Sequence, residues 1–268
     1  MKQKTIKSLY LLKTYYNISQ HFFYRLILTG FVLLFSLGLT GLVNAQKTVV
    51  SFPSADSLEL TADLYFLADS LPYLLLMHEQ GSSRGEFESL AERFQKMDYN
   101  CMAVDIRNGG NANFISNETV RQTRTGNYIL GREEVENDIR ASVNYAFNKS
   151  GKEVVLLGSG ATGSLCLKIC KEMDEVKGVI ALSPGEFYAP FLSIQDTISN
   201  IQKQVFVAST KTEYPYIEQM LSGIDDEFKT SFKPLDEEGM RGTSALLPKN
   251  PSNGEYWLAI LLFFKEFK

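Results

Sequence analysis

The sequence predicts an α/β fold with one doubly wound, mostly parallel sheet that is opened by an antiparallel hairpin. Apolar runs of strand length alternate along the chain with longer segments whose apolar residues recur at helical spacing, which is typical of βαβ units. Residues 48–52 and 58–66 are predicted to form the hairpin around Ser54-Ala55-Asp56, because apolar and polar residues alternate from Leu58 to Leu64.

The remaining elements follow in the order that this fold class requires. We expect further strands over 73–77, 101–106, 154–157, 176–182, 205–208 and 228–232. We expect helices over 86–97, 133–147, 191–204, 216–221 and 255–267, and one that begins in the glycine turn after residue 157. The segment 108–130 is polar and too long for an ordinary connection, so we expect a functional loop or a lid there.

The first 45 residues differ in composition from the rest of the chain. They contain five Lys or Arg residues and no acidic residue, and residues 26–43 are almost wholly apolar. Val43-Asn44-Ala45 has the small residues and the spacing of a cleavage site. We therefore expect residues 1–45 to be an export signal, with an uncleaved membrane anchor as the alternative. Residues 46–268 would then form a single domain in the periplasm or cell envelope.

Charge and cysteine content exclude several classes of partner and cofactor. The N-terminal segment holds five of the 27 basic residues and none of the 31 acidic ones, so the remaining domain would have a net charge near −9. This argues against nucleic acid or an anionic membrane surface as a partner, and only an uncleaved N-terminal segment would contact a membrane. One His and three Cys beyond residue 45 show no metal-ligand or disulfide spacing, so we expect no metal, no cofactor and no disulfide scaffold.

The turn Gly158-Ser159-Gly160-Ala161-Thr162-Gly163 lies between the apolar run 154–157 and a helix, where chemistry is often placed in α/β proteins. Its letters match the G-x-G-x-x-G dinucleotide-binding pattern. That pattern belongs in the first βα unit and needs an acidic residue about 20 residues later. Here βα units precede the turn, and the next strand ends at Leu182-Ser183-Pro184 with only Glu186 beyond it. A dinucleotide site is therefore a remote alternative.

A strand, a glycine turn and a helix also form the nucleophile elbow of α/β-hydrolases. Three further motifs begin at the ends of predicted strands, namely His78–Phe87, Asp105–Gly110 and Ser183–Phe187. Two more, Asn117–Thr119 and Arg241–Leu246, lie in the segments between predicted elements. Together they make residues 47–268 resemble the α/β-hydrolase family, in particular exported bacterial proteins akin to dienelactone hydrolases and small esterases. The resemblance implies an α/β-hydrolase fold.

The resemblance also implies three catalytic positions, and this sequence departs from the family at each of them. The nucleophile position is Gly160, the histidine position is Arg241 and the acid position is Thr212, although the neighbouring Glu213 could replace the acid. Glycine has no side chain, and Arg stays protonated and cannot act as a general base. We therefore predict that no catalytic triad is intact.

Few other residues could replace the missing nucleophile and base. His78 ends an early strand, where a ligand contact beside the oxyanion site and a structural role are equally compatible with the sequence. Ser159 precedes the apex of the elbow. Ser83 lies in Gly81-Ser82-Ser83-Arg84-Gly85, which matches G-x-S-x-G but occupies the loop that resembles the family's oxyanion loop.

The sequence therefore predicts an exported pseudo-hydrolase with a ligand-binding or scaffold role in the cell envelope. The expected binding groups are Ala161 and the loop containing His78, Gln80 and Gly81, together with two arginines. Arg84 and Arg241 would favour an anionic small molecule. Two alternatives stay open: a weak or unorthodox serine esterase that uses Ser159 or Ser83, and a dinucleotide-binding enzyme.

Overall fold

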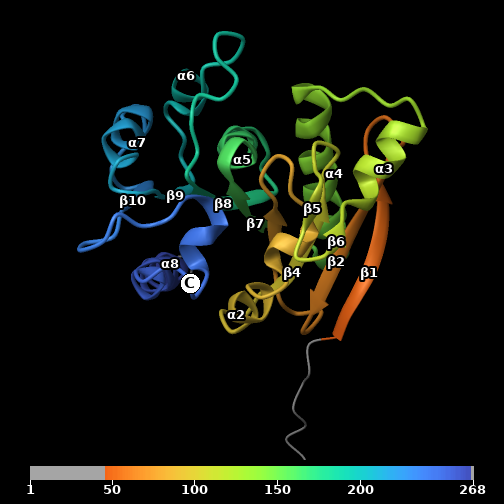
Figure 1. Ribbon diagram of the computed structural model, residues 1–268, viewed down its shortest axis with the longest axis horizontal. Helices are drawn as coiled ribbons and strands as arrows, with labels where there is room; N and C mark the ends of the chain where they lie inside the picture. The colour runs from red at the N-terminus through yellow and green to blue at the C-terminus, as the bar shows by residue number, and fades with distance from the viewer. Residues whose placement is uncertain (1–45, 267–268) are drawn as a thin grey trace, which may run out of the picture. The chain divides into compact units, whose positions relative to one another are not determined.

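A computed structural model describes residues 46–266, which form an eight-stranded sheet in the order β1-β2-β4-β3-β7-β8-β9-β10 (Figure 1). The strands are β1 Gln46–Pro53, β2 Glu59–Phe66, β3 Tyr73–Met77, β4 Asn100–Asp105, β7 Val154–Ser159, β8 Val176–Leu182, β9 Gln204–Ala208 and β10 Lys229–Phe232. Strand β2 pairs antiparallel with both β1 and β4, and all other pairs among these strands are parallel. The predicted fold class is confirmed.

Helices cover both faces of the sheet, as Figure 1 shows. One face carries α4 Arg132–Ser150, α5 Gly160–Glu172, α6 Ile194–Ile198 and α7 Tyr214–Met220, and the other carries α2 Ala91–Gln95 and α8 Asn253–Glu266. Strand β3 shows why its sequence is continuously apolar: Leu75 and Met77 join one core, whereas Leu74 and Leu76 join the other. Strands buried on both faces require such runs.

The segment 108–130 was expected to be a loop, but it contains regular structure. The two-residue strands β5 Asn111–Ala112 and β6 Ile115–Ser116 pair, and α3 Glu118–Thr125 follows. Helix α3 begins at Asn117 because the Asn117 side chain accepts a hydrogen bond from the N–H of Val120. This N-cap was visible in the sequence and was missed.

Two predicted helices are shorter than the sequence indicated. The segment 86–97 is divided into a 3-10 turn, η1 Arg84–Phe87, and helix α2. The segment 191–204 is helical only in α6, which ends before Asn200, a residue with φ of 58°. In both cases buried apolar residues were present at helical spacing, but turns in the backbone interrupt the helix.

The predicted export signal, residues 1–45, lies outside the described residues. Within residues 46–266, no helix combines the length and the apolar character that crossing a membrane would need.

Candidate functional site

Strand β7 passes directly into helix α5 through Gly160, which has φ of 56°. Two other glycines let the strand and the helix approach closely. A Cβ atom on Gly158 would lie 2.8 Å from the Cα atom of Gly163, and one on Gly163 would lie 2.8 Å from the carbonyl oxygen of Gly158. Packing of the strand against the helix thus accounts for Gly158 and Gly163, two of the three glycines that match the dinucleotide pattern.

The space above Gly160 is filled by the carboxylate of Glu79. A Cβ atom on Gly160 would lie 2.4 Å from Glu79 Oε1, so any side chain at this position would require Glu79 to move. Glu79 comes from the loop that follows β3. The sequence analysis did not single it out, although a charged residue just beyond the carboxyl end of a buried strand is a recognisable signal.

Arg241 forms an ion pair with Glu213, with Nε and Oε1 2.5 Å apart. The second carboxylate oxygen of Glu213 accepts hydrogen bonds from the Ser183 hydroxyl at 2.8 Å and from the N–H of Thr210 at 3.1 Å. The acid that meets position 241 is therefore Glu213. Thr212, the position implied by the family resemblance, instead donates its N–H to Glu238.

Glu86 is a third carboxylate close to Glu79 and Glu213, and it binds the backbone N–H of Glu79. Glu86 Oε2 accepts the N–H of Glu79 at 3.1 Å, and Oε1 accepts the hydroxyl of Thr243 at 2.7 Å. Partial burial and then the charge of Glu86 raise the pKa of the Glu79 carboxyl above its ordinary value; Arg241 opposes this shift and Glu213 adds to it.

His78 is fully buried, and both of its ring nitrogens are used. Nε2 lies 3.0 Å from the N–H nitrogen of Ile106 and 3.1 Å from the Asn117 amide nitrogen, while Nδ1 lies 2.8 Å from the Glu79 carbonyl oxygen. Because Nε2 accepts the N–H of Ile106, Nδ1 is the ring nitrogen that donates to the Glu79 carbonyl oxygen. The sequence left both a ligand contact and a structural role open for His78, and these contacts give it the structural role, in which the ring orients the backbone at Glu79.

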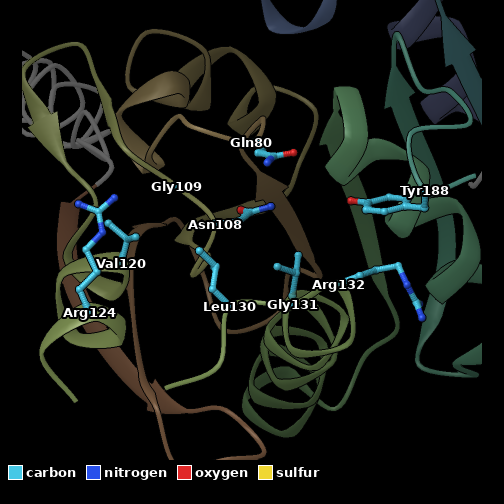
Figure 2. Close-up of a pocket in the computed structure, with 10 residues that line it drawn as sticks. Gln80, Asn108, Gly109, Val120, Arg124, Leu130, Gly131, Arg132 and Tyr188 are labelled. Atoms are coloured by element: carbon cyan, nitrogen blue, oxygen red, sulfur yellow. The ribbon is translucent and has the colours of Figure 1, made fainter. Parts of the chain in front are cut away.

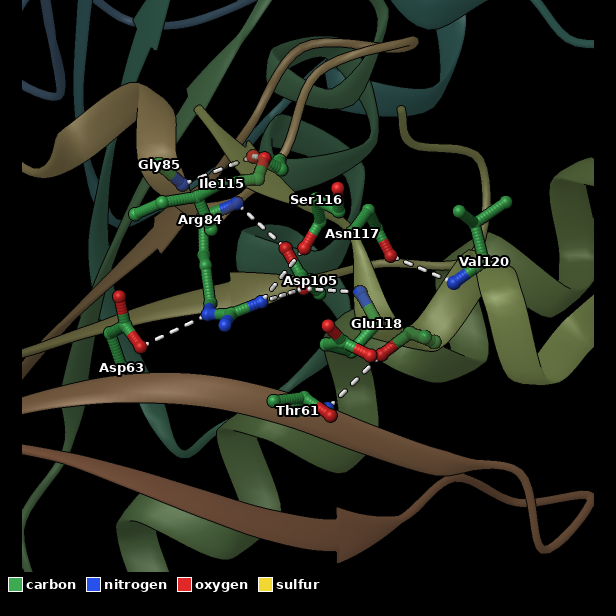
Figure 3. Close-up of polar contacts among 12 residues, drawn as sticks. Thr61, Asp63, Arg84, Gly85, Asp105, Ile115, Ser116, Asn117, Glu118 and Val120 are labelled. Carbon is green, nitrogen blue, oxygen red and sulfur yellow. Dashed lines mark hydrogen bonds and ion pairs between the residues drawn. The ribbon is translucent and has the colours of Figure 1, made fainter. Parts of the chain in front are cut away.

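Arg84 was expected to bind an anion, but it is committed to two carboxylates (Figure 3). Its Nε lies 3.0 Å from Asp63 Oδ1, and its Nη1 pairs with Asp105. The Arg84 side chain is 11% exposed, and the side chain of Asp105 is fully buried. Arg84 thus joins η1 to strands β2 and β4 and is not available to a ligand.

Neither alternative serine has the surroundings of a nucleophile. The Ser83 hydroxyl donates to the carbonyl oxygen of Ile115 at 2.8 Å and accepts the N–H of Gly85, so it caps η1. Ser159 is fully buried, and its hydroxyl has no hydrogen-bond partner among the described residues. Ser159 therefore lacks a base to activate it within residues 46–266.

A cavity of about 480 Å³ is lined by Gln80 from the loop after β3, by Tyr188 and by residues between 108 and 135 (Figure 2). Figure 2 shows the Tyr188 hydroxyl directed toward Asn108 and Gln80 across this cavity. The same hydroxyl donates to the carbonyl oxygen of Ala161 at 3.3 Å, which connects the cavity wall to the first turn of α5. Leu130 adds an apolar side chain.

The loop after β3 contributes fewer free backbone donors than expected. Gly81 donates its N–H to the carbonyl oxygen of Asn108 at 3.0 Å, and Glu79 donates its N–H to Glu86. Of the predicted binding residues in this loop, Gln80 both lines the cavity and keeps a backbone N–H that is not used in these contacts. No group of three or more His, Cys, Asp or Glu side chains within residues 46–266 is placed to hold a metal ion.

Comparison with solved structures agrees with this architecture. No family model matches the sequence, and no curated protein matches it in sequence. An esterase from Pyrococcus furiosus superposes with a TM-score of 0.61 at 16% identity, covering 84% of this chain and 94% of that chain. A dienelactone hydrolase from Anabaena variabilis gives 0.61 at 14% identity, covering 83% and 98%.

An α/β hydrolase from Penicillium is similar to the same extent, with a TM-score of 0.63 at 12% identity over 82% of this chain and 98% of that chain. Identities this low establish shared architecture and leave the activity to be argued from the site. The strand order, the single antiparallel strand β2 and the turn at Gly160 fit the same architecture. The chain therefore has the α/β-hydrolase fold.

Proposed function

We propose that this protein has lost ester hydrolysis and acts as a ligand-binding or scaffold protein. The observation that carries the proposal is the elbow itself, where Gly160 offers no nucleophile and the Glu79 carboxylate fills the space of the missing side chain. Hydrolases of this fold attack a carbonyl carbon with a side chain at this apex. Without that side chain, no covalent intermediate forms there.

The position of the general base supports the same proposal. A guanidinium group has donors and no acceptor, and Arg241 is ion-paired with Glu213, so it cannot act as the general base for a nucleophile or for water. Nucleophile, base and acid act as one unit in serine hydrolases, so the loss of two of them removes most of the rate enhancement. The cavity beside Ala161 and Gln80 supports a remaining role in binding.

The cellular place of this role is part of the proposal. Export to the periplasm or cell envelope is supported by the basic and then apolar composition of residues 1–45. N-terminal sequencing of the protein recovered from the cell envelope tests it, and an N-terminus at Gln46 is expected.

The loss of hydrolysis is tested with a fluorophosphonate probe and with p-nitrophenyl acetate and butyrate. We expect no stoichiometric labelling of the purified protein and no saturable ester hydrolysis above the buffer rate. An active esterase of the same fold, treated in parallel, controls for the quality of the reagents. Labelling of one serine per chain, with mass spectrometry locating it at Ser159 or Ser83, would refute the proposal in favour of an unorthodox esterase.

A further inference from the structure

The outer face of helix α8 is apolar, unlike the outer faces of α4 and α5. Leu258, Leu261 and Leu262 are 57%, 39% and 50% exposed, although the opposite face of α8 is buried in the core. Their spacing joins the three leucines into one stripe along the helix. The exposed residues of α4 and α5 are all polar, namely Glu133, Asn144, Asn148, Lys149, Lys171 and Glu172. A helix that is apolar on every side is typical of an interior, so the stripe indicates a partner surface.

The residues of this face are arranged symmetrically about Ile260. Leu258 and Leu262 lie two residues before and after it, and Glu255 and Lys265 lie five residues before and after it. Two copies of α8 that pack antiparallel about this centre would place Leu258 against the partner's Leu262. The same arrangement would place Glu255 near the partner's Lys265. A patch that matches itself in this way is what a two-fold interface requires.

Both charged residues of this face are available for such pairing. Lys265 is exposed and has no ion pair or hydrogen bond among residues 46–266. Glu255 Oε2 accepts the N–H of Leu235 at 2.8 Å, and its Oε1 has no partner in the described part of the chain. A parallel pair of helices would bring like charges together at both ends, whereas an antiparallel pair brings unlike charges together. The charges therefore favour the antiparallel arrangement.

We propose that the outer face of α8 binds a second copy of this chain, as an antiparallel helix pair about a two-fold axis near Ile260. Ala259 would lie opposite the partner's Leu261, so that a small residue faces a large one. Leu235 is 80% exposed and is held beside α8 by its hydrogen bond to Glu255, so it adds apolar area at one end of the stripe. Removal of these leucines from water supplies the driving force for association.

An anionic lipid surface fits the same face less well. The acidic run Asp236-Glu237-Glu238 follows Leu235 directly, and Glu255 and Glu266 lie at the two ends of α8. These carboxylates would be repelled by anionic lipids, whereas a second copy offers Lys265 to Glu255. The inference does not depend on the proposed loss of hydrolysis, because α8 contributes no residue to the turn at Gly160.

Sedimentation velocity of the purified protein over a range of concentrations tests the inference. We expect a species with the mass of two chains, in exchange with the single chain. Leu258→Lys should weaken the dimer by at least about a hundredfold, because it places a charge twice in the apolar centre of the interface. Leu258 is exposed in the single chain, so circular dichroism should show an unchanged fold. Phe191→Lys is the matched control, since Phe191 is 92% exposed on the loop before α6, and it should leave the dimer unchanged.

Charge reversal tests the orientation of the two helices. Lys265→Glu should weaken the dimer by about tenfold, because two attractive pairs become repulsive, and addition of Glu255→Lys should restore the affinity. A single-chain mass at every concentration would overturn the inference, as would a dimer that Leu258→Lys leaves unchanged. Dissociation by Phe191→Lys alone would overturn it in favour of another interface. A double variant that stays as weak as Lys265→Glu would overturn the antiparallel arrangement.

Discussion

The Glu79 carboxylate lies directly against the backbone of Gly160 and leaves no room for a side chain there. A Cβ atom on Gly160 would lie 2.4 Å from Glu79 Oε1. The two residues come from different strand ends, after β3 and after β7. The space that a side chain at position 160 would need is therefore filled by Glu79. This contact also makes the relationship measurable, since a change at one residue should depend on the other.

Gly160→Ala should destabilise the fold for two separable reasons. The backbone at Gly160 has φ of 56°, which costs a residue with a Cβ atom about 1–2 kcal/mol. The overlap with Glu79 adds a steric cost that disappears when Glu79 is shortened. In a double-mutant cycle measured by urea unfolding, Glu79→Ala should therefore recover part of the loss caused by Gly160→Ala. Strict additivity of the two changes would show that the contact does not matter.

Arg84→Met should destabilise the protein by about 3–5 kcal/mol, because it leaves the buried Asp105 carboxylate without its partner. Arg124→Met is the matched control, since Arg124 is exposed and has no ion pair among the described residues, and it should change stability by less than about 0.5 kcal/mol. Urea unfolding measures both. Equal small effects would mean that Arg84 is not the structural residue that its contacts indicate.

The contrast between Arg84 and Gly160 shows which parts of the site could be predicted from the sequence. The turn at residue 160 between a strand and a helix could be predicted because a strand-length apolar run precedes it and a helical pattern follows, and both are local patterns. Arg84 could not be assigned correctly, because its partners Asp63 and Asp105 lie on β2 and β4 and only the sheet order brings them together. Local periodicity contains no information about such pairings.

The same limit explains the residues around the apex that the sequence analysis missed or misplaced. Glu79 follows β3, and its direction depends on a hydrogen bond from its N–H to Glu86 in η1. Position 212 and position 213 could not be distinguished, because the residues after β9 form a turn without periodicity. The structure separates them by their contacts, since Glu213 meets Arg241 and Thr212 does not.

Glu79→Gln should change the pH dependence of stability. The pKa of Glu79 is raised above 4.5 in the folded protein, first by burial and then by Glu86. A carboxyl whose pKa is higher in the folded than in the unfolded protein destabilises the fold at any pH where it is ionised in both. This destabilisation disappears as the pH falls from the pKa of the folded protein to that of the unfolded protein. The gain in stability of Glu79→Gln over the wild type should therefore be larger at neutral pH than at about pH 4.

Thermal unfolding of wild type and Glu79→Gln across this pH range checks the prediction. Glu92→Gln removes the same charge from an exposed site and should show no comparable change with pH. If the difference between Glu79→Gln and wild type is constant across the range, the carboxyl is not perturbed by its neighbours.

Ser159→Ala should leave the fold as stable as the wild type or make it more stable by about 1 kcal/mol, because it removes a buried hydroxyl that has no partner. Ser164→Ala is the contrasting variant. The Ser164 hydroxyl donates to the carbonyl oxygen of Gly185 at 2.8 Å and accepts the N–H of Gly185 at 2.9 Å. Its removal should cost about 1–3 kcal/mol, since two buried backbone groups lose their partner.

Urea unfolding of both serine variants decides between two roles for Ser159. A stability gain for Ser159→Ala means that the hydroxyl makes no structural contact and is kept at a cost to the fold. A loss for Ser159→Ala as large as that for Ser164→Ala would mean that the hydroxyl has a structural partner.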